Sequence, residues 1–311
     1  MRSKVNLLLL TVLLFACGDD NRFPIQWYEP NEVKVKIDPT KENKIATPNG
    51  VVVRIPAGSF VTDSDGKPLR DSCTIVLRDL VYLPDMLFSG MGTITTSGGI
   101  LSTGGMLLLA TDTLSHIRFC DTCAVDCYFP RKHAVVPDMN LYELSGGAWQ
   151  WKDSAEGATF QVGNRFWQGD TALSPDEMDR RRLEYEKSME YYVFKYNSFG
   201  WINCDALLTQ FDDRGTLRCK VQSGDSLVVR LIIPELRSII TGHVLGDVVQ
   251  FDEVPANRSI QLFAFGKRDE APCYYAKEVV VTDDLVVNIE PVFASVEQIR
   301  EHADKVCRAP N

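Results

Sequence analysis

Three closely spaced cysteines form the densest group of reactive side chains in the chain. Cys120, Cys123 and Cys127 lie within HIRFCDTCAVDCYF, and His116 and His133 lie nearby. Thiolates at such intervals hold zinc or iron–sulfur clusters. The segment also fits a strand, an Asp-Thr turn and a second strand, with Cys120 and Cys123 flanking the turn. We therefore expect a structural disulfide or buried thiols among the three cysteines rather than a metal site. A redox role for the Cys-x-x-Cys pair is the further alternative, and no βαβ context surrounds it.

A second group of side chains could bind calcium. Asp63 and Asp65 precede Gly66 in the sequence DSDG, and Asp71 follows soon after. An EF-hand loop needs further oxygen ligands and a closing glutamate, which this stretch lacks. Asp, Ser and Gly are also the residues that favour tight turns. We expect a turn here, and a surface Ca²⁺ held by Asp63, Asp65 and Asp71 remains the alternative.

Cys204, in GWINCDA, is the one cysteine whose surroundings suggest a nucleophile, with His243 or His116 as its base. Nothing in the sequence orients such a pair. Turn hydrogen bonds made by Asn203 and Asp205 would explain the same stretch. The glycine-rich SGGILSTGGM runs between expected strands, so its glycines fit loop and bulge positions rather than a phosphate-binding loop. We expect no catalytic residue and no cofactor.

Four tryptophans bear on a possible sugar-binding surface. Trp149, Trp151 and Trp167 could stack against sugar rings. Trp149 and Trp151 alternate along one expected strand and therefore share one face, which equally fits packing on a core. Trp201 is expected to pack on a sandwich core. Exposure of these rings decides between the two interpretations.

Short β-branched and aromatic runs supply the elements that would position these residues. VKVKI at 33–37 alternates apolar and charged residues, which is typical of a half-buried strand. Further runs, each bounded by turn residues, are VVVRI, CTIVL, MLLLAT, SLVVRLII, SIQLFAF and KEVVVT. Many short strands without intervening helices indicate antiparallel sandwiches.

Two segments have helical signatures. In SPDEMDRRRLEYEKSMEYY, Ser174 and Glu177 form a capping box around Pro175, and the charged central face indicates a solvated connector. In ASVEQIREHADKVCR, Ser295 is the expected N-cap and Gln298 completes a second box. The stripe expected to pack on the last sheet consists of Val296, Ile299, Ala303 and Val306.

The expected fold is therefore mainly β. It comprises two antiparallel β-sandwich domains joined by a short helical connector, with a C-terminal helix. The expected divisions are a signal peptide at 1–16, a lipidated tether at 17–44, a first sandwich at 45–168, the connector at 169–191, a second sandwich at 192–292 and the final helix at 293–311.

The N-terminal segment LLLLTVLLFACGDD predicts export. The apolar run from Leu7 to Ala16 follows Arg2 and Lys4. It is much shorter than the roughly 20 residues that a membrane-spanning helix needs. A basic start, a short apolar run and a small residue are typical of a secretory signal peptide.

The end of this run resembles the lipobox of bacterial lipoproteins. The residues are Leu14, Phe15, Ala16 and Cys17, and Phe15 is bulkier than the residue usual at its position. The resemblance implies cleavage before Cys17 and acylation of that residue, which would anchor the chain in a lipid bilayer. The acidic pair after Gly18 resembles the surface-export signal of Bacteroides-group lipoproteins, and it equally fits a solvated tether beside the lipid headgroups. Alternatives are an ordinary leader with Cys17 in a disulfide, or a buried N-terminal strand.

Charge and cysteine number fit an exported protein. The chain has a formal charge of −9 at pH 7, and loss of the two basic residues of the leader makes it more acidic still. An acidic chain is poorly suited to nucleic acid. Disulfides persist in oxidising compartments. Besides Cys17, the even set of eight cysteines comprises Cys73, Cys120, Cys123, Cys127, Cys204, Cys219, Cys273 and Cys307.

The first expected sandwich resembles a ZU5 domain. The resemblance rests on GVVVRIPAGSF at 50–60, the turn DSDGKPL and the strand CTIVLRD. TITTSGGILSTGGMLLLAT and FGWINCD resemble stretches found in bacterial lipoproteins of this kind. ZU5 domains are β-sandwich modules of ankyrins and netrin receptors, with mostly protein-binding or structural roles. The His-Phe-Ser site at which some relatives cleave themselves is absent from this sequence.

Together these features predict a non-enzymatic lipoprotein of the outer membrane, at the cell surface or on the periplasmic face, with a binding or scaffolding role. Its expected partners are the lipid bilayer, through acylated Cys17, and an unidentified protein or glycan. The alternatives are a carbohydrate-binding module of a surface glycan system and a cysteine- or metal-dependent enzyme.

Overall fold

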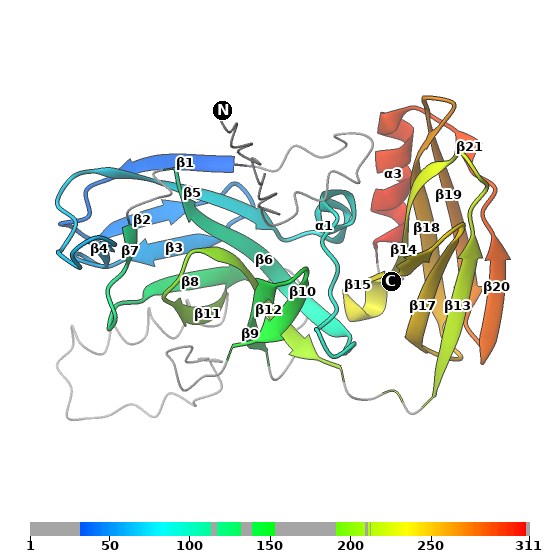
Figure 1. The fold of residues 1–311 in the computed structure, drawn as a ribbon, viewed down its shortest axis with the longest axis horizontal. Helices are drawn as coiled ribbons and strands as arrows, with labels where there is room; N and C mark the ends of the chain where they lie inside the picture. Colours follow the sequence, from blue (N-terminus) through cyan, green and yellow to red (C-terminus); the bar gives the residue numbers. More distant parts are fainter. Residues whose placement is uncertain are drawn as a thin grey trace, which may run out of the picture.

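The computed structural model describes residues 32–112, 117–131, 139–152, 191–208, 211 and 213–308. Within these ranges most of the chain forms short strands, arranged in two groups of sheets that lie side by side (Figure 1). The prediction of a mainly β protein of the sandwich class with a C-terminal helix is confirmed.

The first sandwich packs a six-stranded antiparallel sheet against a four-stranded one. Its core joins Leu77 and Leu109 of the larger sheet to Val53, Phe129 and Phe194 of the smaller. The larger sheet has the order β1 (Glu32–Ile37), β5 (Cys73–Leu80), β6 (Leu101–Thr111), β12 (Gly200–Leu207), β9 (Asn140–Ser145) and β10 (Ala148–Trp151). The smaller has the order β11 (Tyr191–Tyr196), β8 (Val125–Pro130), β3 (Val52–Ile55) and β2 (Asn43–Ala46), and a separate two-stranded sheet pairs β4 (Phe60–Thr62) with β7 (Ile117–Phe119).

The second sandwich has its own core, which includes Leu217, Leu231 and Phe251. Only the pairing of β13 with β20 is parallel among its described strands. One sheet has the order β16 (His243–Leu245), β17 (Val248–Pro255), β13 (Arg214–Lys220) and β20 (Asp284–Asn288). The other has the order β15 (Ser238–Thr241), β14 (Ser226–Ile233), β18 (Ser259–Arg268), β19 (Ala271–Val280) and β21 (Val292–Phe293).

Strand pairing corrects the expected division of the chain. β1 and the start of β2, which fall within the expected tether at 17–44, belong to the first sandwich. β11 and β12 were expected in the second sandwich, but β11 pairs with β8, and β12 lies between β6 and β9. The first sandwich therefore extends from 32 to 207 among the described residues. Order along the sequence does not reveal these pairings because they join segments far apart in the chain. The connector helix expected at 169–191 lies outside the described residues, apart from Tyr191.

The C-terminal helix forms as predicted. α3 spans Val296–Val306, and Ser295 and Gln298 complete the reciprocal capping box that fixes its start. Ile299 and Ala303 are buried against β18 and β19 (Figure 1). The periodic apolar stripe therefore holds the helix on the second sandwich.

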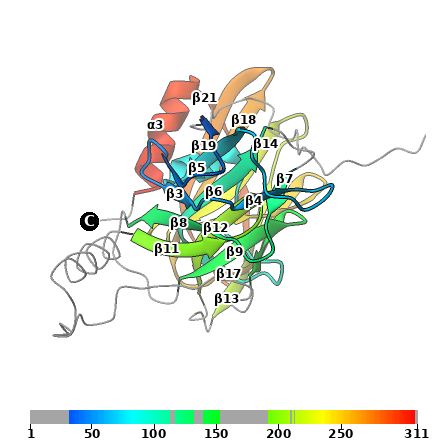
Figure 2. The same cartoon turned by 90° about the vertical axis from the view of Figure 1, so that its left-hand side faces the viewer.

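A third cluster of buried side chains joins the two sandwiches. It includes Leu80 and Trp149 from the first, and Ile232, Phe263 and Ile299 from the second. The short helix α1 (Leu83–Ser89) lies at this junction, beside β15 and α3. In Figure 2, seen from the end of the first sandwich, the second sandwich lies directly behind it. The two sandwiches thus share buried apolar surface, which a flexibly linked pair would not.

Candidate functional site

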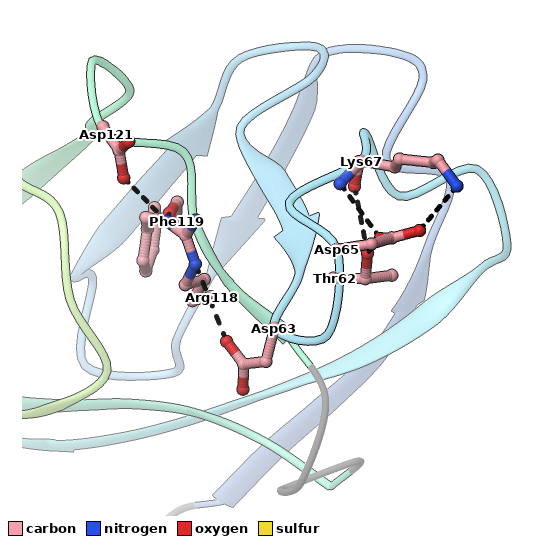
Figure 3. Close-up of polar contacts among 7 residues, drawn as sticks. All are labelled: Thr62, Asp63, Asp65, Lys67, Arg118, Phe119 and Asp121. Atoms are coloured by element: carbon pink, nitrogen blue, oxygen red, sulfur yellow. Dashed lines mark hydrogen bonds and ion pairs between the residues drawn. The ribbon is translucent and has the colours of Figure 1, made fainter.

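The β4–β7 ladder brings the two predicted candidate sites of the first sandwich together. Phe60 pairs with Phe119, so the DSDG loop leaves one end of the ladder and the CDTC turn leaves the other. Arg118 connects them: its Nη1 donates to Asp121 Oδ1 at 2.7 Å, and its Nε lies 3.9 Å from Asp63 Oδ1 (Figure 3). The sequence did not reveal this connection, because it depends on a strand pairing across more than fifty residues.

The aspartate loop is a turn whose charges are balanced by cations of the chain itself. Asp65 accepts hydrogen bonds from the Thr62 hydroxyl and from the Lys67 backbone amide, and it pairs with Lys67 Nζ at 2.7 Å (Figure 3). The bond to the Lys67 side chain is the main cause of the lowered pKa of Asp65. Gly66 has a φ of 66°, which suits glycine. Asp71 lies exposed on the approach to β5.

This geometry agrees with the predicted turn. A Ca²⁺ ion would have to displace Lys67 from Asp65, and the carboxylate of Asp63 already faces Arg118. Within the described part of the chain, no cluster of three His, Cys, Asp or Glu side chains is arranged to hold a metal ion.

Of the three cysteines, Cys120 and Cys123 form a disulfide across the turn, with their Cα atoms 5.1 Å apart. Cys127 is a free thiol buried in β8, and its burial raises its pKa. His116 and His133 lie outside the described residues. The other free cysteines of the described chain are likewise buried: Cys73, Cys204, Cys219, Cys273 and Cys307.

Cys204 and His243 do not form a nucleophile–base pair, and His116, the other expected base, lies outside the described residues. Cys204 is buried in β12, and burial raises the pKa of its thiol well above the ordinary value. His243 is exposed on β16 in the second sandwich. A buried, protonated thiol with no base beside it is a poor nucleophile.

Asn203 and Asp205 lie within strand β12 and not in a turn, which corrects the sequence interpretation. They form a buried polar cluster with Thr103 of β6. Thr103 Oγ1 donates to Asn203 Oδ1 at 3.0 Å, and Asn203 Nδ2 donates to Asp205 Oδ2. Two polar residues inside a strand gave a misleading signal because Asn and Asp are rare in strands unless their side chains find buried partners.

Glycines allow β6 and β12 to approach at this point. The pairing register shifts between Cys204 and Asp205, opposite Gly105, whose φ is 139°. A Cβ atom on Gly104 would come within 3.1 Å of the carbonyl oxygen and the sulfur of Cys204. The glycines of STGGM therefore occupy a bulge, as predicted.

Arg237 extends from the second sandwich to this cluster. Its Nε donates to the Thr103 carbonyl at 2.8 Å and its Nη2 to the Val81 carbonyl at 3.0 Å. Burial raises the pKa of Asp205 well above its ordinary value, and the Arg237 charge acts in the opposite direction. Asp205 Oδ1 has no hydrogen-bond partner among the described residues. Through Arg237, this cluster supports the junction of the two sandwiches.

The three described tryptophans occupy different environments. Trp149 is 2% exposed, and its Nε1 donates to the Gly92 carbonyl at 2.7 Å. Trp201 is half-buried and packs against the junction core. Trp151, at the end of edge strand β10, is 60% exposed. Although Trp149 and Trp151 share one face, the core covers only the first. Trp167 lies outside the described residues.

Exposed apolar side chains gather at the edges of the second sandwich. Val244 and Leu245 lie on edge strand β16, and they are 64% and 58% exposed. Val292 and Phe293 form edge strand β21, at 57% and 60%. Edge strands also present backbone groups that a further strand can pair with.

Comparison with known proteins adds no family assignment. No family model matches the chain, and no curated protein matches it. Among the described residues, no helix combines the length and apolar character needed to cross a membrane. Cys17, the predicted lipidation site, lies outside the described residues.

Proposed function

We propose that this protein is a lipid-anchored protein of the bacterial outer membrane that binds another protein through the edges of its second sandwich, without enzymatic activity. The observation that carries the binding role is the exposure of Val244, Leu245, Val292 and Phe293 on edge strands. Extended segments of a partner can add to such edges through backbone hydrogen bonds, and apolar side chains beside them supply burial.

The anchor is proposed from the sequence. Cys17 and β1 are separated by residues 18–31. A chain of this length spans at most about 50 Å when fully extended. An acylated Cys17 would therefore keep the start of β1 within about that distance of the membrane surface. The proposed role is to present a binding surface there, which is also the role that the ZU5-like resemblance implies.

Position-specific photo-crosslinking in intact cells tests the binding surface. A photoreactive amino acid in place of Val244 or Phe293 should give discrete adducts, because both side chains point outward at proposed contact edges. Glu301, an exposed residue of α3 that lies on neither edge strand, is the control position. The same adducts from all three positions would argue against an edge-specific partner.

Trp151 favours glycan binding as a second candidate function. Its exposed ring could stack on a sugar face, whereas Trp149 and Trp201 are engaged in packing. Titration with oligosaccharides from a glycan array should quench tryptophan fluorescence if this function is correct. Trp151→Ala should then abolish the response and Trp151→Phe should retain part of the affinity. A response that survives in Trp151→Ala would exclude this ring as the binding platform.

A further inference from the structure

The described cysteines divide into two chemical classes. Six, including Cys127 and Cys204, are free and buried. Burial raises the pKa of each of these six thiols. Cys120 and Cys123, in contrast, are joined in a partly exposed turn. Thiol–disulfide exchange requires a thiolate to reach a sulfur atom. In the described part of the chain, the Cys120–Cys123 bond is therefore the place where exchange is accessible.

The turn is held by bonds that do not need the disulfide. The Cys123 amide donates to the Cys120 carbonyl, and the Cys120 amide donates to the Ser59 carbonyl, both at 3.0 Å. Arg118 Nη1 adds bonds to Asp121 Oδ1 and to the Phe119 carbonyl. The disulfide encloses only two residues, and short loops gain the least from closure. Its reduction should leave the sandwich folded.

The surroundings of the two sulfur atoms differ. Cys120 Sγ lies 3.7 Å from the Thr122 hydroxyl, which can donate a hydrogen bond to a thiolate. Cys123 Sγ lies 3.6 Å from the Gly58 carbonyl oxygen, whose negative end opposes a thiolate. Cys120 is therefore the better leaving group, and Cys123 is the sulfur that an incoming thiolate should attack.

We propose that Cys120–Cys123 is a thiol–disulfide exchange site that accepts electrons from a dithiol protein in the compartment of this chain. One partner thiolate attacks Cys123 Sγ, forms a mixed disulfide and releases Cys120 as a thiolate, which takes up a proton. The second partner thiol, losing its proton, attacks the mixed disulfide and frees Cys123, which is protonated. The partner becomes a disulfide, and two electrons and two protons pass to Cys120 and Cys123.

The site also contacts the neighbouring loop. Asp121 lies inside the disulfide ring and holds Arg118, which faces Asp63 (Figure 3). Since the Arg118 bonds and the backbone bonds of the turn do not need the disulfide, this connection should persist in the reduced form.

Treatment of the native full chain with dithiothreitol, a small dithiol probe, tests the proposal. Alkylation and peptide mapping should label Cys120 and Cys123, while the six buried cysteines stay protected and the circular dichroism spectrum stays unchanged. Thr122→Val should slow reduction by about threefold, since the leaving thiolate loses its hydrogen-bond donor. Thr40→Val, at an exposed turn in the same sandwich, is the matched control and should leave the rate unchanged.

Two results would overturn the proposal. One is a disulfide that dithiothreitol reduces only together with unfolding or with labelling of the buried cysteines. The other is a doubly substituted chain, Cys120→Ser with Cys123→Ser, that fails to fold, because the bond would then be structural. As a second measurement, the single variant Cys120→Ser should leave Cys123 able to form a stable mixed disulfide with an aromatic disulfide reagent. Failure of Cys123 to form that adduct in the folded variant would also contradict it.

Discussion

Asp205 shows how one buried side chain links stability to pH. Its folded-state pKa is raised well above the model-peptide value of 3.8, chiefly because burial disfavours its charged form. A group with a raised folded pKa contributes stability that is complete below its unfolded pKa and is lost as pH rises towards the folded value. Arg237 opposes this loss. Burial, and after it the nearby Asp205, raises the pKa of Tyr142 to about 12.

Asp205→Asn should therefore be most beneficial at high pH. The amide keeps an oxygen to accept the bond from Asn203 Nδ2 but cannot ionise. We expect the melting temperature of the variant to match that of the original chain near pH 4 and to exceed it by a few degrees at pH 8. Thermal scans across this range provide the measurement. A variant equally destabilised at every pH would show that Asp205 is charged in the folded state.

The sequence predicted which residues would form a disulfide or a turn better than it predicted the residues that they contact. It predicted the disulfide group around Cys120, and it predicted the turn at Asp65. It misplaced Asn203 and Asp205, because a strand interior was not the expected place for two polar side chains two residues apart. Their partners, Thr103 and Arg237, come from other strands, and no local pattern encodes such contacts.

At the scale of elements, α3 is the part whose formation follows most directly from its own sequence. Ser295 Oγ accepts a hydrogen bond from the backbone amide of Gln298, and Gln298 Oε1 accepts one from the backbone amide of Ser295. Ser295→Ala should reduce the free energy of unfolding by about 1 kcal/mol. Urea titration measures this loss of unfolding free energy. Ser72→Ala, at an exposed position before β5, is the control. Equal effects of the two substitutions would mean that the cap does not stabilise the helix.

Strands were harder to assign to sheets than to recognise. The alternating VKVKI predicted β1 as a strand, but its pairing with β5 places it in the sandwich rather than in the tether. β11 and β12 were expected in the second sandwich because they follow the expected connector helix. The insertion of β12 between β6 and β9 depends on packing across the whole sheet, to which a local sequence window is insensitive.

At the scale of the whole molecule, Arg237 of the second sandwich forms hydrogen bonds with the first sandwich. Arg237→Met removes the bonds to the Thr103 and Val81 carbonyls, both near the buried core. Hydrogen bonds from a charged donor contribute about 1.5–3 kcal/mol each, so we expect a loss of about 3 kcal/mol in unfolding free energy. Arg54→Met, which breaks the partly exposed ion pairs of Arg54 with Glu42 and Asp126, should shift the denaturation midpoint much less.

The shape of the unfolding transition gives a second readout of the junction. In the original chain the two sandwiches should unfold together, because they share the buried cluster that contains Phe263 and Trp149. In Arg237→Met the transition should broaden or separate into two steps. A single sharp transition at the original midpoint would show that Arg237 contributes nothing to the union of the two sandwiches.

The proposed function depends most directly on how the chain is attached to the cell. Intact-mass measurement of the protein purified from membrane fractions provides the test. The account predicts a mature chain that begins at Cys17 and carries added acyl mass, and it predicts that Cys17→Ser abolishes acyl labelling while the β-rich body stays folded. A mature chain that begins at another residue, or begins at Cys17 without acyl mass, would contradict the lipid anchor and the membrane location proposed with it.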